Sequence, residues 1–160
     1  MDAIIIGGGP AGISCAIWLK KLGVRCVLLE ASGHLGGLQT RSPYENLWIP
    51  GVQGQTGQQV AASLAHHTLV TGVDFRLNCP ALSVDGHLIT TRAGTFIAPY
   101  LVIATGSRPR TGGFTASDRI VIGPGVAMEA LAVKGKRIAI LAVGIMLSIR
   151  RGLCVIAAAR

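Results

Sequence analysis

Residues 3–30, AIIIGGGPAGISCAIWLKKLGVRCVLLE, carry the strongest structural signal in the chain. The aliphatic run Ala3–Ile6 leads directly into glycines, which is typical of a central parallel strand buried on both faces. The next residues space their apolar side chains as a helix does, and two lysines before Gly23 predict its end. Residues 24–29 predict a second strand, with Glu30 at its tip.

A glycine-rich turn joins the first strand to the helix, with G-x-G-x-x-G at Gly7, Gly9 and Gly12. In a dinucleotide-binding domain the first glycine permits the tight turn, the second lets a pyrophosphate approach, and the third lets helix and strand pack closely. The helix N-terminus then faces the phosphates, and Glu30 accepts the hydroxyls of an adenosine ribose. A purely structural glycine turn, with Glu30 as a solvated residue, is the alternative.

Length and composition indicate one globular domain whose hydrophobic core is covered on several sides. The chain has 160 residues, of which 50% are hydrophobic and 14% charged, so disorder is excluded. The net charge of +8 is concentrated late: residues 1–127 carry nine Lys and Arg against six Asp and Glu, and residues 128–160 carry six against one. With only seven aromatic residues, nucleic-acid binding through a mixed basic and aromatic surface is not expected.

The cysteines and the apolar segments bear on location. Cys15, Cys26, Cys79 and Cys154 lack the C-x-x-C spacing of a redox pair or a metal site, which favours a reducing cytoplasm. The first residues lack the basic region of a secretory signal. The uncharged run at residues 138–149 is shorter than the roughly 20 residues of a membrane helix, so no membrane anchor is expected.

Five segments of the chain form a recognisable set: GGGPAG at 7–12, GGLQT at 36–40, ENLWIPG at 45–51, TGQQV at 56–60 and ATGS at 104–107. Together they resemble the FAD-binding part of the thioredoxin-reductase-like pyridine nucleotide-disulfide oxidoreductases. The resemblance implies an α/β fold: a Rossmann-like FAD/NAD(P)-binding domain whose parallel sheet is flanked by helices and a small antiparallel β-meander.

The resemblance also implies FAD as cofactor and a set of binding residues. These are Gly7, Gly9, Pro10, Ala11, Gly12, Glu30, Ala31, Gly37, Leu38, Gln39, Asn46, Ala104, Thr105 and Gly106. Gln39 and Asn46 offer amide groups suited to the edge of a flavin ring, although as ordinary polar loop residues they would need no such role. Full-length relatives pass hydride from NAD(P)H to FAD and then to a disulfide or other acceptor, and they form homodimers.

The remaining elements before residue 108 follow from periodicity. Residues 56–70 predict a helix on which His66 and His67 form a solvated face rather than a metal site. Short strands are predicted at 74–77, 88–91, 95–97 and 100–103, with Asp-Gly and Ala-Gly turns among them. Together these strands suit the meander that covers the parallel sheet in the family.

The resemblance ends after the first domain. We expect an FAD-binding domain at 1–112, a linker at 113–130, and at 131–160 a vestigial or out-of-frame start of an NAD(P)H-binding domain, because Gly144 stands alone where a second glycine motif should follow. No residue is predicted as a catalytic acid, base or thiol, because in such enzymes the flavin carries the chemistry. A truncated oxidoreductase with little NAD(P)H-driven turnover is the resulting expectation.

Three alternatives stay open on sequence alone. One is a ferredoxin–NADP reductase-like flavoenzyme that uses no disulfide. Another is a noncatalytic dinucleotide-binding module that holds NAD or a free adenine nucleotide with the same glycines. The third is a membrane-surface or interaction protein that uses the basic, aliphatic tail at 134–160.

Overall fold

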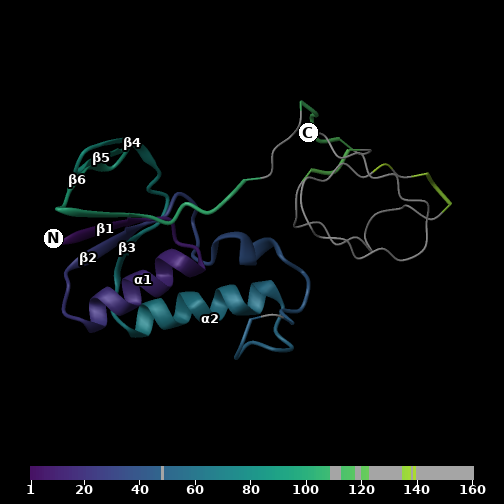
Figure 1. Ribbon diagram of the computed structural model, residues 1–160, viewed down its shortest axis with the longest axis horizontal. Helices are drawn as coiled ribbons and strands as arrows, with labels where there is room; N and C mark the ends of the chain where they lie inside the picture. The colour runs from purple at the N-terminus through teal and green to yellow at the C-terminus, as the bar shows by residue number, and fades with distance from the viewer. Residues whose placement is uncertain (48, 109–112, 118–119, 123–134, 138, 140–160) are drawn as a thin grey trace. The chain divides into compact units, whose positions relative to one another are not determined.

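A computed structural model of the chain describes residues 1–47, 49–108, 113–117, 120–122, 135–137 and 139. The chain divides into two compact units, Met1–Val126 and Ala127–Arg160, and almost all described residues belong to the first (Figure 1). The vestigial or out-of-frame segment that we expect at 131–160 lies outside the described residues, apart from 135–137 and 139.

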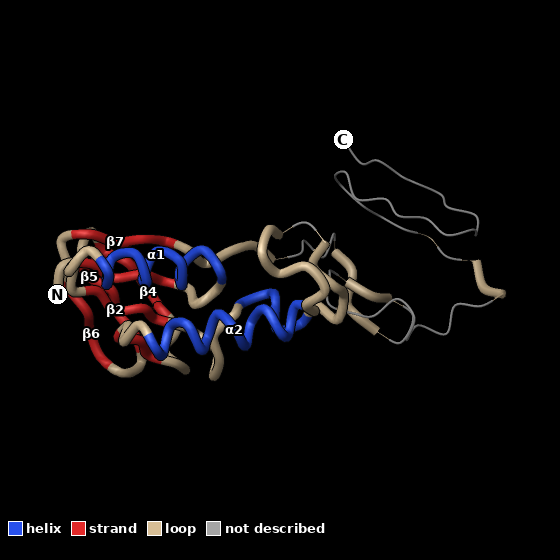
Figure 2. The backbone as a smooth tube through the Cα atoms, turned by 90° about the horizontal axis from the view of Figure 1, so that it is seen from below, coloured by secondary structure: helices blue, strands red, loops and turns tan. Residues whose placement is uncertain are grey.

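The first unit is built on a four-stranded parallel sheet. Its order is β3-β2-β1-β7, formed by Asp74–Arg76, Cys26–Leu29, Ala3–Ile6 and Tyr100–Ile103. Helices α1 (Pro10–Lys21) and α2 (Gly57–Val70) lie side by side along one face of this sheet (Figure 2). The predicted parallel sheet with flanking helices is therefore confirmed.

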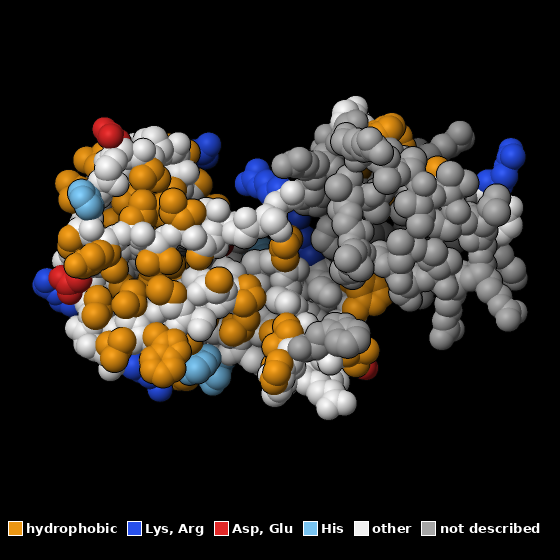
Figure 3. Space-filling model, viewed as in Figure 1, with side chains coloured by type: hydrophobic (Ala, Val, Ile, Leu, Met, Phe, Trp, Pro, Cys, Tyr) orange, Lys and Arg blue, Asp and Glu red, His pale blue; other side chains and the backbone are white. Residues whose placement is uncertain are grey.

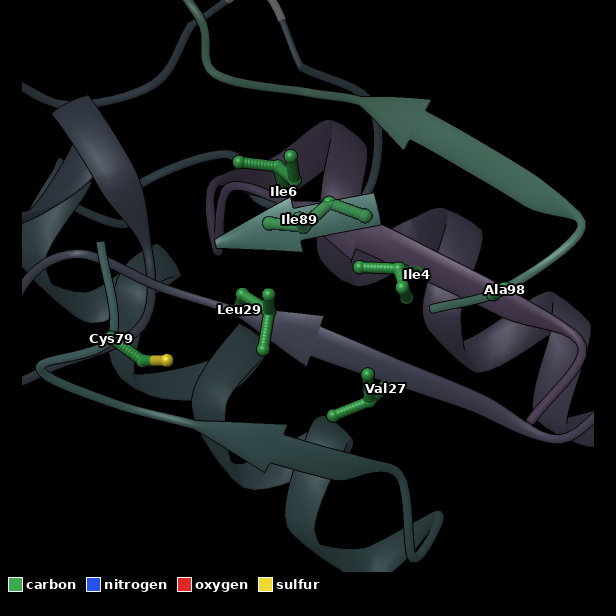
Figure 4. Close-up of a cluster of buried hydrophobic side chains, with 7 residues drawn as sticks. All are labelled: Ile4, Ile6, Val27, Leu29, Cys79, Ile89 and Ala98. Carbon is green, nitrogen blue, oxygen red and sulfur yellow. The ribbon is translucent and has the colours of Figure 1, made fainter. Parts of the chain in front are cut away.

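An antiparallel meander accompanies the parallel sheet. It consists of β4 (Ala81–Asp85), β5 (Leu88–Thr91) and β6 (Gly94–Ile97), joined in that order. Its buried side packs on β1 and β2 through one apolar cluster: Ile4, Ile6, Val27, Leu29, Cys79, Ile89 and Ala98 (Figure 4). The meander thus covers the sheet face that the helices leave free.

Strand β1 is buried on both faces, which explains its uninterrupted aliphatic sequence. Ile4 and Ile6 point to the meander, whereas Ile5 packs with Leu28 and with the α1 side chains Ile13 and Ile17 on the helical side. Because successive side chains of a strand alternate between faces, burial on both sides requires an apolar residue at every position.

Two strand boundaries differ from prediction. The second strand begins at Cys26 rather than at residue 24, because the Val24 N–H donates to the Leu19 carbonyl and prolongs the turn that ends α1. The strand predicted at 74–77 ends at Arg76.

The strands predicted at 74–77 and 100–103 belong to the parallel sheet and not to the meander, so their grouping was wrong. Strand β4 and the 3-10 helix η1 (Gly37–Arg41) were not predicted. β4 has mostly exposed side chains and an irregular register against β5, although Leu82-Ser83-Val84-Asp85 alternates apolar and polar residues as a strand does.

Replacing Ile5 tests the helical side of the core. Ile5 is fully buried, so Ile5→Ala should lower the free energy of unfolding by about 2–5 kcal/mol. Leu69→Ala on α2, where the side chain is 60% exposed, should change it by less than about 0.5 kcal/mol. Urea denaturation followed by circular dichroism measures both, and equal losses would contradict the packing described.

Candidate dinucleotide-binding site

Two positions in the turn between β1 and α1 must be glycine, because a Cβ atom there would overlap other atoms of the chain. Gly7 has φ +111°, and a Cβ atom there would overlap the Ala104 carbonyl oxygen. A Cβ at Gly12 would overlap the Gly7 carbonyl oxygen and lie 3.3 Å from the Ala104 Cβ. These two glycines therefore let α1 pack closely against the ends of β1 and β7, whatever the site binds.

Gly9 differs from both neighbours. Its backbone is extended, with φ −80° and ψ −179°, which any residue adopts. The nearest heavy atom to a Cβ at Gly9 would be the Gly37 Cα at 3.8 Å, an ordinary contact. Among the described residues, nothing in the chain itself therefore calls for glycine here.

The loop after β2 closes on this glycine turn. The Gly36 N–H donates to the Gly8 carbonyl at 2.8 Å. Gly37 has φ +57°, and a Cβ there would lie 2.8 Å from the Gly9 Cα. A side chain on Gly37 would therefore collide with the backbone at Gly9, so glycine at Gly37 lets the two loops lie against each other beside the start of α1.

The two helices begin in contrasting ways. α2 has a complete capping box, in which the Thr56 hydroxyl accepts the Gln59 N–H and the Gln59 amide oxygen accepts the Thr56 N–H. α1 begins at Gly9 and Pro10 with no side-chain cap and no acidic residue in its first turn, among the residues described. Its free N–H groups and positive dipole end are therefore suited to an anion.

The Glu30 carboxylate lies at the same edge of the sheet. One oxygen accepts the Gly8 N–H at 2.6 Å, and the other accepts both the Ser32 N–H at 2.7 Å and the Ser32 hydroxyl at 2.8 Å. These donors hold the carboxylate beside the glycine turn. The role of Ser32 was not predicted, although a serine two residues after the acid is a usual local partner for it.

The end of β7 supplies a third segment. The Ala104 N–H donates to the Ile6 carbonyl at 2.8 Å, so Ala104 continues the alignment of β7 with β1. Thr105 and Gly106 follow it and are exposed. The structure thus brings the predicted residues of the glycine turn together with Gly37 and with those at the ends of β2 and β7. The strand ends meet because the carboxyl ends of parallel strands share one edge of the sheet.

The predicted flavin-facing residues lie in η1 and in the loop that follows. Leu38 is 45% exposed, and the Gln39 amide oxygen is buried against Gly57 without a hydrogen-bond partner among the described residues. The Asn46 side chain donates to the Gln55 carbonyl at 3.2 Å. Asn46 is therefore engaged in its own loop, whereas the Gln39 oxygen is a buried acceptor that still needs a donor.

Three cysteine thiols lie in the described part of the chain. Cys15, Cys26 and Cys79 are free, and burial raises the pKa of the Cys26 thiol, which disfavours the reactive thiolate. No group of three His, Cys, Asp or Glu side chains within the described part of the chain could hold a metal ion. None of the helices described there is both long and apolar enough to cross a membrane.

An open parallel sheet with a glycine turn, a bare helix N-terminus and an acid after the second strand is the architecture of a dinucleotide-binding protein. The family model of the pyridine nucleotide-disulphide oxidoreductases matches residues 1–141. The chain belongs to this family, as its sequence resemblance predicted.

Individual relatives agree with this membership. The chain is 34% identical over 113 residues to a ferredoxin–NADP reductase of Leuconostoc citreum, covering 66% of this chain and 33% of that protein. It is 29% identical over 130 residues to a thioredoxin reductase of Mycolicibacterium smegmatis, covering 79% and 41%. The solved thioredoxin reductase of Lactococcus lactis superposes with a TM-score of 0.60 at 28% identity, covering 68% and 36%. The chain thus spans less than half the length of these relatives.

Gly9 and Gly12 should respond oppositely to the same added methyl group. Gly12→Ala forces a Cβ into the Gly7 carbonyl oxygen, so the free energy of unfolding should fall by about 3 kcal/mol or more. The Cβ of Gly9→Ala makes only an ordinary contact with the Gly37 Cα at 3.8 Å, so this change should cost about 1 kcal/mol or less. Denaturant titration of both variants measures this difference, and a Gly9→Ala variant as unstable as Gly12→Ala would refute it.

Proposed function

We propose that the first unit binds FAD, with the pyrophosphate at the Gly7–Gly12 turn and the adenosine ribose at Glu30. The observation that carries this proposal is Gly9, the one glycine of the motif for which the fold gives no steric reason. The uncapped start of α1 supports it, because the free N–H groups there suit a phosphate. The carboxylate of Glu30 can accept ribose hydroxyls while it keeps its bonds to Gly8 and Ser32.

The flavin end of the cofactor is assigned to η1 and the end of β7. The Gln39 amide, whose oxygen has no hydrogen-bond partner among the described residues, offers polar groups of the kind that pair with the edge of a flavin ring. Leu38 offers exposed apolar surface beside it, and the residues at 104–106 end the neighbouring strand. The backbone of Gly37 and the exposed Ala31 complete the set that we assign to the cofactor.

Bound FAD would supply the hydride-accepting chemistry, and the role of the protein is to bind and orient it. We propose that the chain acts as the FAD-binding part of an oxidoreductase that receives hydride from NAD(P)H. The similarity to a thioredoxin reductase and to a ferredoxin–NADP reductase supports both a disulfide and a protein electron carrier as acceptor. A homodimer and a cytoplasmic location remain predictions of the family resemblance and of the unpaired cysteines.

A flavin-binding test separates this proposal from a module for NAD or adenine nucleotides. Added FAD should bind the purified chain, and binding should change the absorbance and fluorescence of the flavin. ADP and NAD should compete only weakly with FAD, because they lack a flavin ring to make contacts with the protein. Tighter binding of NAD or ADP than of FAD would favour the noncatalytic module. The titration needs no turnover, so it tests the site of this chain directly.

Gly9→Val should remove detectable FAD binding, because its side chain would occupy the approach path of the pyrophosphate. The fold should persist, since the Gly9 backbone is extended and a Cβ there meets only the Gly37 Cα at 3.8 Å. Ala62→Val on the exposed side of α2 is the matched control, and it should bind FAD as the parent chain does. Unchanged FAD affinity in Gly9→Val, with circular dichroism intact, would defeat the assignment.

Glu30→Gln tests the ribose end of the site. Loss of the charged acceptor should weaken FAD binding about tenfold or more. Ser32→Ala should weaken it less, because the Ser32 N–H still holds the carboxylate. Equal FAD affinity of the Glu30→Gln variant and the parent chain, measured by the same fluorescence titration, would remove Glu30 from the site.

A further inference from the structure

The Glu30 carboxylate already accepts three hydrogen bonds from within the chain. Its Oε2 atom accepts the Gly8 N–H at 2.6 Å, and its Oε1 atom accepts the Ser32 N–H at 2.7 Å and the Ser32 hydroxyl at 2.8 Å. A carboxylate has roughly four acceptor positions, divided equally between its oxygens. Oε1 is therefore fully occupied, whereas Oε2 has one position left.

Glu30 is the only acid at the carboxyl ends of the described strands of the parallel sheet. Asp2 and Asp74 lie at the opposite edge, where they are paired with Arg25 and Arg76. Figure 3 shows the acidic side chains of the described surface scattered singly over the face in view. An adenosine ribose, which donates two hydroxyls, therefore has to find both of its charged acceptor positions on Glu30.

The Ser32 hydroxyl has a second acceptor within reach. Its Oγ atom lies 2.8 Å from the His34 carbonyl oxygen and also 2.8 Å from Glu30 Oε1. A hydroxyl carries one proton, so it donates to only one of these oxygens at a time. The charged carboxylate is the stronger acceptor of the two. The His34 carbonyl is the alternative acceptor when another donor takes the carboxylate oxygen.

An exchange between these two acceptors needs no movement of the backbone. The Ser32 carbonyl accepts the Asn78 N–H at 2.9 Å, and the Ser32 N–H stays on the carboxylate. The Gly36 N–H fixes the same loop to the Gly8 carbonyl. Because both acceptors already lie at hydrogen-bond distance from Oγ, rotation of the O–H bond is sufficient.

We propose that the Ser32 hydroxyl determines how strongly the site distinguishes ribose from deoxyribose. The inference rests on the proposed position of the adenosine ribose at Glu30. One ribose hydroxyl donates to the open position on Oε2. The second donates to Oε1 only when the Ser32 proton turns to the His34 carbonyl, so Ser32 exchanges a charged hydrogen bond for a neutral one. A sugar with one hydroxyl leaves Ser32 on the carboxylate.

The Ser32 hydroxyl thus competes with the second ribose hydroxyl. The gain in affinity from that hydroxyl is reduced by the difference between a charged and a neutral hydrogen bond. Removing the Ser32 hydroxyl ends the competition, so the preference for ribose should rise, whatever the change in affinity for FAD itself. If Ser32 only oriented the carboxylate, its loss would have the opposite effect, because a loosened carboxylate distinguishes the two sugars less well.

Fluorescence titration with FAD and with its 2′-deoxyadenosine and 3′-deoxyadenosine analogues tests this role. The quantity compared is the dissociation constant of each analogue divided by that of FAD. In Ser32→Ala this ratio should rise about fivefold over the parent chain for at least one analogue, because no Ser32 proton is displaced. Ser32→Thr keeps a hydroxyl and should retain the parent ratio. Ser63→Ala, at an exposed serine of α2, is the matched control and should also retain it.

Glu30→Gln separates this inference from the assignment of the ribose itself. If Glu30→Gln keeps the parent ratio, Glu30 does not hold the ribose, and the ribose position and the role of Ser32 are both wrong. If Glu30→Gln loses the preference for ribose but Ser32→Ala keeps or lowers it, the ribose position stands and the role of Ser32 is wrong. Circular dichroism spectra that match the parent chain exclude loss of the fold as the cause of either result.

Discussion

The close approach of α1 to the ends of β1 and β7 is the contact on which the rest of the first unit depends. It exists because Gly12 has no side chain between its Cα and the Gly7 carbonyl, and because Gly7 has none against Ala104. Three segments distant in sequence therefore meet without intervening side chains. The helix N-terminus is held at the carboxyl edge of the sheet, where the end of β2 places Glu30 beside the same turn.

Some polar groups of the first unit are satisfied by neighbouring residues, whereas others have no hydrogen-bond partner among the described residues. α2 satisfies its own first turn through Thr56 and Gln59, whereas α1 has no such cap. The Glu30 carboxylate is fixed by donors from Gly8 and Ser32, whereas the Gln39 oxygen is buried without one. A bare helix start costs free energy in the absence of a partner, so its presence at the carboxyl edge of the sheet is consistent with a cofactor site.

Much of the first unit was predictable because its sequence signals are local. Ala3–Ile6 is aliphatic throughout, as burial on both faces requires, and the apolar periodicity of residues 56–70 predicts α2, whose first turn Thr56 and Gln59 cap. The grouping of the short strands was not predictable in the same way. Tyr100–Ile103 is uniformly apolar like β1, and it pairs with β1 rather than with the meander that precedes it.

The sequence by itself determined the order of strand, glycine turn, helix, strand and acid, because each depends on residues close together in the chain. The tertiary structure showed what each motif glycine faces: a Cβ would overlap backbone atoms of the chain at Gly7 and Gly12, and would make only an ordinary contact with the Gly37 Cα at Gly9. The partnership of Glu30 with Gly8 and the burial of the Gln39 oxygen were likewise decided there. Each of these depends on which distant segments become neighbours, and residue spacing within one segment carries no information about that.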